Sequence, residues 1–249
     1  DDVEKIAGVL KNRQASFDGF VVVMRADRVV STAVAIEYML QGFGKPIIFT
    51  GSRHSPKSIA IQDIKKIIKM GGLGLRSNVI NAAQIATDDT FPLTALMFGN
   101  KVIKPTKAIR KDFYNLNLFR SADEEYLVRI DFGISLSRPK KSESPKRFSS
   151  KLSRSVVAFD MTTLAAKHAL GKVQKADVLL LRIAENEVFD VPAYEELRKR
   201  FPLIILFNEN YVLDQNCFAL LTKMTWHTAQ MKVLWAHAAA KDNEEFRSL

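Results

Sequence analysis

Blocks of apolar residues with two different periods predict the elements of the first half of the chain. Residues 3–10 and 32–40 carry apolar side chains at helical spacing, whereas 20–24, 46–50 and 93–98 are short apolar runs that predict buried strands. A strand, a helix and a second strand therefore follow one another in the first fifty residues or so. This order, with a buried apolar strand at each end, is typical of a parallel α/β sheet.

The second half of the chain alternates in the same way and predicts a smaller α/β unit. The expected strands are 155–159, 177–183 and 203–207, and the expected helices are 162–170, 193–201 and 225–239. Between the halves, RPKKSESPKRFSSKLSR at 138–154 contains seven Lys or Arg, five Ser and two Pro, which predicts an exposed linker. We therefore expect an N-terminal domain at 1–137, this linker, and a C-terminal domain at 155–249.

Residues 57–70 form a separate amphipathic pattern. Isoleucines recur there at helical spacing with lysines between them, and Gly71 and Gly72 follow. The pattern predicts a helix that either packs on its own domain or binds a partner. The glycines that follow, up to Ser77, could hold a phosphate or serve as a plain connector, and they lack the Gly-Lys-Ser/Thr ending of a P-loop.

Composition excludes some classes of protein and favours others. The 249 residues are 47% hydrophobic and 26% charged, an ordinary globular mixture, and no apolar run is long enough to cross a membrane. The single cysteine, Cys217, excludes a disulfide within the chain. The four histidines show no zinc-like spacing with carboxylates or Cys217, so we expect neither a metal nor a cofactor.

The net charge of +10 favours partners that carry phosphates or acidic surfaces, although a basic chain can also reflect its compartment. Three basic clusters are the candidate contacts for RNA or for an acidic partner: Lys57, Lys65, Lys66 and Lys69; Lys101, Lys104, Lys107, Arg110 and Lys111; and Arg138, Lys140, Lys141, Lys146 and Arg147. A spacing of three would align the second cluster on one helical face, but Pro105 favours a partial loop. Taken alone, each cluster could equally be a solvated surface.

Residues 18–56 read DGFVVVMRADRVVSTAVAIEYMLQGFGKPIIFTGSRHSP. They resemble the core of the bacterial-type (type I) L-asparaginases, in which a strand ends in His-Gly-Thr-Asp-Thr and, after a helix, Gly-Lys-Pro, four apolar residues and Thr-Gly-Ser form the next strand. The resemblance extends to roughly Ile130 and reappears in the second half. It implies a two-domain α/β fold, with a mostly parallel sheet in a larger N-terminal domain and a smaller α/β C-terminal domain.

The resemblance also implies that the catalytic residues are degenerate. The family's His-Gly-Thr-Asp-Thr is replaced by Met24-Arg25-Ala26-Asp27-Arg28, so Ala26 stands at a catalytic threonine. Ungapped counting puts Arg110 at the family's catalytic lysine, with Lys107 or Lys111 there if the alignment shifts. Asp27 is retained and is expected to pair with Arg25 or Arg28, and the two arginines are expected to fill the former substrate cavity or to bind an anion there.

In the family, a nucleophile strand and a substrate loop precede the position at which this chain starts. We therefore expect either further N-terminal residues or another chain to cover the neighbouring strand. With the basic charge, this predicts a non-catalytic scaffold subunit of a large ribonucleoprotein, a mitochondrial ribosome or one of its assembly intermediates. Its partners would be RNA and proteins, with no membrane, and it could form homo- or hetero-oligomers through the asparaginase-like fold.

Two alternatives remain open at the level of sequence. One is an active L-asparaginase or other amide hydrolase, and the other is a structural subunit of a protein-only complex, bound through residues 57–70. The expected compartment of the leading hypothesis is the mitochondrial matrix, or otherwise the cytoplasm.

Overall fold

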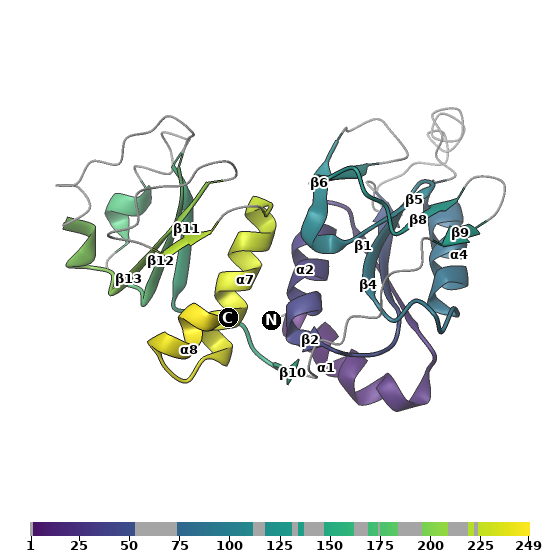
Figure 1. Ribbon diagram of the computed structural model, residues 1–249, viewed down its shortest axis with the longest axis horizontal. Helices are drawn as coiled ribbons and strands as arrows, with labels where there is room; N and C mark the ends of the chain where they lie inside the picture. The colour runs from purple at the N-terminus through teal and green to yellow at the C-terminus, as the bar shows by residue number, and fades with distance from the viewer. Residues whose placement is uncertain are drawn as a thin grey trace, which may run out of the picture. The chain divides into compact units, whose positions relative to one another are not determined.

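The computed structural model divides the chain into two compact units, Asp1–Ser150 (unit 1) and Lys151–Leu249 (unit 2). It describes residues 2–52, 74–111, 118–130, 134–136, 147–161, 169–173, 175–183, 196–208, 219–221 and 224–249. Figure 1 shows that each unit has its own sheet with helices packed against it. Among the described residues, no helix is long and apolar enough to cross a membrane.

Unit 1 is built on a six-stranded sheet in the order β1-β3-β4-β5-β8-β9. Its strands are β1 (Phe20–Arg25), β3 (Ile47–Ser52), β4 (Thr94–Phe98), β5 (Lys101–Ile103), β8 (Val128–Ile130) and β9 (Ile134–Leu136). The first three are parallel and the remaining pairs are antiparallel. Two-stranded pairs accompany the sheet: β2 (Leu40–Gln41) with β10 (Arg147–Phe148), and β6 (Ala108–Arg110) with β7 (Phe119–Ser121).

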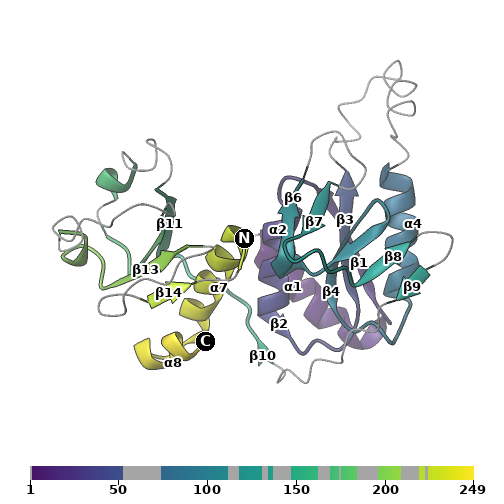
Figure 2. The same cartoon turned by 45° about the horizontal axis from the view of Figure 1, so that its top comes forward.

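Helices cover both faces of this sheet, as Figures 1 and 2 show. They are α1 (Asp2–Arg13), α2 (Val29–Met39) and α4 (Gly74–Ala86), with short 3₁₀ turns η1 (Gln14–Ser16) and η3 (Pro105–Lys107). On the α4 face, Ala82 and Ile85 pack against Ile48, Met97 and Val102 of the strands. Strand side chains alternate between faces, so the intervening buried residues of β3 and β4 lie on the α2 face. Residues 47–49 of β3 and 95–98 of β4 are therefore apolar on both faces.

Two glycines have positions that explain the local chain path. Gly44, after α2, has a φ of +78°, in the left-handed region that side chains disfavour. Gly51, near the end of β3, faces β1 so closely that a Cβ would lie 1.8 Å from the carbonyl oxygen of Met24. The absence of a side chain at Gly51 therefore allows the carboxyl ends of β1 and β3 to meet.

Unit 2 is a parallel four-stranded sheet in the order β11-β12-β13-β14. Its elements are β11 (Val156–Asp160), β12 (Val178–Arg182), β13 (Leu203–Phe207), β14 (Ala219–Leu221), α7 (Trp226–Ala239) and α8 (Asn243–Ser248). Helix α7 packs on β11 and β12 and begins at Thr225, whose hydroxyl accepts a hydrogen bond from the Thr228 amide. On the face of β12 away from α7, Leu179 and Leu181 pack in one buried cluster with Phe201. Both faces of β12 are therefore buried.

The mixed α/β class predicted from the pattern is confirmed, and most apolar runs became strands. One local prediction differs from the structure, because β10 lies within the range expected to be linker. Between Lys101 and Arg110, the partial loop that Pro105 favours is the 3₁₀ turn η3, and β5 and β6 flank it as strands and not as one helical face. The helix α4 begins at Gly74, within the glycine-containing stretch that ends at Ser77. Residues 57–70 lie outside the described residues.

Candidate functional site

The candidate site lies where the parallel strands of unit 1 end. β1, β3 and β4 run in the same direction, so Arg25, Ser52 and Phe98 share one edge of the sheet. The carboxyl edge of a parallel sheet is where ligands bind in open α/β folds. After β1 the Arg28 amide donates to the Arg25 carbonyl at 3.2 Å, and this turn leads directly into α2.

Arg25 and Asp27 form an ion pair on this turn. Arg25 Nη2 lies 2.9 Å from Asp27 Oδ2 and Nε lies 3.2 Å from Oδ1, with side chains 67% and 44% exposed. The hydrogen bond from Arg25 lowers the pKa of Asp27 below its ordinary value. Arg28 is also exposed, so the expectation that the two arginines fill a cavity is wrong.

Ala26 is the buried member of the same turn. It is only 4% exposed, whereas its neighbours Arg25 and Asp27 face solvent. A methyl group here packs under the turn and offers neither a hydroxyl to activate nor a hydrogen bond to substrate. Ala26 is therefore part of the packing at this edge.

Asn78 of α4 holds the ends of two of these strands together. Its Nδ2 donates to the Gly51 carbonyl at 3.2 Å, and its Oδ1 accepts from the Gly99 amide at 2.9 Å. The side chain is buried, so both bonds form away from water. Thr50 adds a third link, because its hydroxyl donates to the Met97 carbonyl at 2.7 Å.

Two lysines of the second basic cluster are neutralised by carboxylates. Lys107 Nζ lies 2.8 Å from Asp123 Oδ2, and this hydrogen bond, with one from Ser121, lowers the pKa of Asp123 to about 2. Lys104 Nζ lies 3.7 Å from Glu37 Oε1. These two lysines are therefore less available to an external anion than the sequence suggested.

Glu37 is unusual among the acidic residues of unit 1. Its side chain is 23% exposed, but Oε2 is buried and has no hydrogen-bond partner among the described residues. Burial raises the pKa of Glu37 to about 7, against the opposing attraction of Lys104. Burial, together with the nearby Glu37, also raises the pKa of Tyr38.

Arg110 ends β6 and lies in the hairpin with β7, where it is opposite Phe119. The guanidinium does not lose its proton at working pH, so it cannot replace a lysine base. Lys111 follows it on the exposed side of the hairpin.

Lys101, at the start of β5, has a different environment from Lys104 and Lys107. Its Nζ lies 4.4 Å from the centre of the Tyr126 ring and 3.3 Å from Tyr126 Oη. Arg129, directly opposite Lys101 on β8, has its guanidinium carbon 5.1 Å from the same ring. Two cations therefore share one aromatic side chain.

The remaining predicted contacts are only partly described. Arg147 lies in β10 and is exposed. The other residues of the first and third clusters lie outside the described residues: Lys57, Lys65, Lys66, Lys69, Arg138, Lys140, Lys141 and Lys146. Within the described ranges, no group of three or more His, Cys, Asp or Glu could hold a metal ion.

Comparison with known proteins bears on this geometry. The family model for the asparaginase N-terminal domain matches residues 1–142, more than half of the chain and nearly all of unit 1. The chain belongs to the asparaginase family.

The asparaginase relatives are distant. L-asparaginase 1 of Escherichia coli is 25% identical over 145 residues, covering 58% of this chain and 39% of the relative. The L-asparaginase of Dirofilaria immitis is 25% identical over 138 residues, and the 60 kDa lysophospholipase of Mus musculus is 22% identical over 134. Each of these two alignments covers 54% of this chain. They cover 21% of the Dirofilaria immitis protein and 22% of the Mus musculus protein. The chain thus spans about two fifths of its bacterial relative's length.

Solved structures extend the likeness to both units. L-asparaginase I of Vibrio cholerae matches with a TM-score of 0.73 at 17% identity, covering 99% of this chain and 77% of that one. The thermostable L-asparaginase of Thermococcus kodakarensis matches with a TM-score of 0.70 at 17% identity, covering 99% and 78%. The asparaginase fold therefore includes unit 2, which the family model over residues 1–142 does not reach.

Several residues that shape this edge did not stand out in the sequence. Tyr126 and Arg129 meet Lys101 only because β5 and β8 pair, and Asp123 and Glu37 reach their lysines across the fold. The short apolar pairs Val102-Ile103 and Leu127-Val128 are the strand signals that could have indicated the first pairing.

Proposed function

We propose that this asparaginase-family protein is a non-catalytic scaffold subunit of a large ribonucleoprotein, a mitochondrial ribosome or one of its assembly intermediates. The observation that carries the proposal is the turn after β1. Ala26 is buried without a hydroxyl, and the neighbouring Asp27 carboxylate is bound by Arg25. A fold retained with this turn altered fits a role in assembly better than a role in hydrolysis.

The chemistry of amide hydrolysis supports the same conclusion. A hydroxyl nucleophile requires a base that removes its proton, because a free hydroxyl is a poor nucleophile at neutral pH. Arg110 at the lysine position cannot act as that base, and Lys107 is held by Asp123. Ala26 and Arg110, which stand at the two family positions, therefore supply neither half of such a pair.

The charge of the chain supports RNA as a partner. A net charge of +10 attracts polyanions over a long range, and each phosphate contact releases counterions and adds salt-dependent affinity. Such contacts hold a scaffold in place without reading sequence. The mitochondrial matrix is the compartment that we propose for this assembly.

A second candidate is an L-asparaginase or related amide hydrolase. Two observations favour it: Asp27 is retained, and the family contains L-asparaginases. If this candidate is right, purified protein releases ammonia from asparagine and Asp27→Ala abolishes the release.

Two assays on the purified protein separate these candidates. The proposal predicts no ammonia release from asparagine above a protein-free blank, and binding to structured RNA that weakens steeply as salt is raised. Hydrolysis that depends on Asp27, or RNA binding that is absent or insensitive to salt, would contradict it.

A further inference from the structure

The second basic cluster contains cations with two different kinds of partner. Lys104 and Lys107 each lie beside a carboxylate, which satisfies much of their charge. Lys101 and its neighbour Arg129 have Tyr126 as their shared partner, and no carboxylate of the described residues forms an ion pair with either. Lys101 and Arg129 are therefore two neighbouring cations of this sheet whose described partner is an aromatic ring and not a carboxylate.

The register of the sheet fixes the pair in place. Lys101 of β5 is directly opposite Arg129 of β8, so both side chains project from the same face of the sheet. The adjacent Val102 and Val128 are fully buried and anchor the two strands. The Leu127 amide donates to the Val102 carbonyl at 2.9 Å, which places Tyr126 beside the pair.

Directly opposed like charges destabilise a sheet, so this arrangement carries an unfavourable interaction. The Tyr126 ring offsets part of it, because its negative face attracts the Lys101 ammonium 4.4 Å away and the Arg129 guanidinium 5.1 Å away. An anion bound between the two cations would remove the repulsion and gain hydrogen bonds from both.

Other cations lie along the same edge. Lys101 pairs with Phe98 at the end of β4, which places it at the carboxyl edge that also carries Arg25 and Arg28. β1 and β5 are three strand positions apart in the sheet, roughly 14 Å at the usual strand spacing. Arg25 is paired with Asp27, so the cations at the two ends of this edge are spaced for separate phosphates of an extended polyanion and not for a single phosphate.

We propose that Lys101, Tyr126 and Arg129 form a contact site for the phosphate backbone of RNA. The inference rests on the proposed ribonucleoprotein function and names the part of the surface that carries it. Tyr126 is half-buried, and arginine and lysine beside such an aromatic ring are a common combination for RNA, whose phosphates bind the cations. The exposed Glu124 and Glu125 lie just before Tyr126 and limit the affinity of this site.

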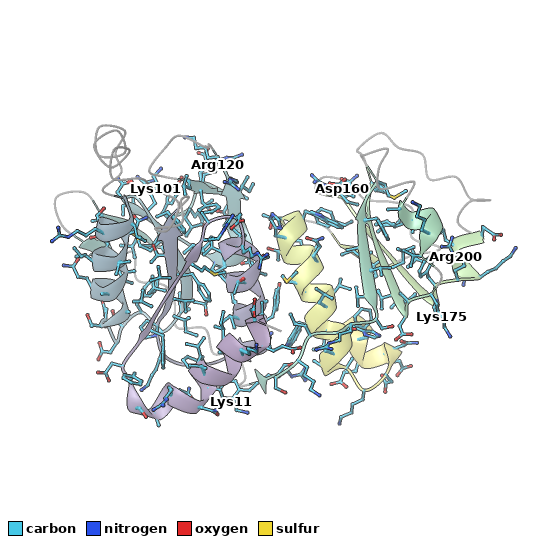
Figure 3. The ribbon with its side chains drawn as sticks, turned by 180° about the vertical axis from the view of Figure 1, so that it is seen from behind. Lys11, Lys101, Arg120, Asp160, Lys175 and Arg200 are labelled. Carbon is cyan, nitrogen blue, oxygen red and sulfur yellow. The ribbon has the colours of Figure 1, made fainter. Side chains whose placement is uncertain are left out.

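Lys11 provides a matched control within the same unit. It is also an exposed lysine over an aromatic ring, with Nζ 5.7 Å from the centre of Phe148. It lies in the last turn of α1, and Figure 3 shows it at the opposite end of unit 1 from Lys101 and Arg120. Lys11→Gln removes one positive charge, against two in a variant of both Lys101 and Arg129, and does not touch the proposed site.

The test is a fluorescence-anisotropy titration of the full chain with a fluorescein-labelled stem–loop RNA over a series of KCl concentrations. Lys101→Gln/Arg129→Gln should bind roughly tenfold more weakly than wild type at low salt, because about two phosphate contacts are lost. The slope of log affinity against log salt should become shallower by about 1.4 to 1.8. Lys11→Gln should match wild type in both measures.

The outcomes separate this inference from the function on which it rests. If wild type binds RNA and the double variant binds equally well, the site is wrong and the ribonucleoprotein function stands. If wild type does not bind RNA, both the site and the ribonucleoprotein function are wrong. Thermal unfolding of the double variant should occur no lower than that of wild type, which excludes misfolding as the cause of weak binding.

Discussion

At the scale of single residues, the turn after β1 combines one buried small side chain with two exposed charged ones. Ala26 is buried, and its two neighbours form an exposed ion pair of the kind that contributes little to stability. The sequence was sufficient to predict that Asp27 pairs with a nearby arginine, because the partner lies two residues away. It was not sufficient to predict that Arg25 faces solvent, since exposure depends on how β1 is placed in the sheet.

Glu37 provides a test of residue-scale electrostatics through pH. Its pKa is about 7 in the folded protein, whereas the ordinary value for a glutamate side chain is 4.5. A carboxyl group whose pKa is raised by folding contributes stability below the unfolded value and loses it as pH rises through the folded value. The stability of wild type should therefore fall between about pH 4.5 and pH 7 because of this group.

Glu37→Gln should remove that loss, since the amide carries no charge to bury. Relative to wild type, we expect the variant to gain about 1–2 kcal/mol in free energy of unfolding at pH 8 and little at pH 4. Urea denaturation at the two pH values measures the difference. Glu196→Gln is the control, because Glu196 is exposed and paired with Lys199. An equal effect of both substitutions, or the same gain from Glu37→Gln at pH 4 and pH 8, would refute the interpretation.

At the scale of elements, long apolar runs were predictable and short mixed ones were not. β1, β3 and β13 are continuous apolar runs that could be identified directly. The segment from Lys101 to Arg110 has lysines and an arginine three apart, which suggested a helical face, but Pro105 opens a 3₁₀ turn between two three-residue strands. Short strands of this kind depend on tertiary pairing, so local spacing does not reveal them.

The contact between β1 and β3 makes a sharp prediction about glycine. Gly51→Ala would place a methyl group 1.8 Å from the Met24 carbonyl oxygen, so the two strands must separate. We expect a loss of roughly 2–4 kcal/mol in the free energy of unfolding, measured by urea denaturation.

Gly8→Ala is the matched substitution. Gly8 lies within α1, and an added Cβ there meets nothing within 4 Å. Alanine is the better helix former, so this variant should gain about 0.5–1 kcal/mol. If the two variants change stability by similar amounts, the close packing of β1 on β3 is wrong.

At the scale of the whole molecule, two units share one asparaginase fold, although the family model ends near the end of unit 1. The sequence allowed the division to be anticipated from the change of composition after residue 137. It could not indicate that β10 pairs with β2 and so belongs to unit 1, because only two residues of that strand are paired. At this scale the proposed function rests on the net charge and on the turn after β1 together.

The most direct test of the ribonucleoprotein proposal is sedimentation of the native protein from cell extract through a density gradient, with and without ribonuclease. The account predicts fast sedimentation that collapses to slow fractions after ribonuclease treatment, because RNA holds the assembly together. A slow peak of the size of a small oligomer, unchanged by ribonuclease, would contradict the account and favour the amide hydrolase instead.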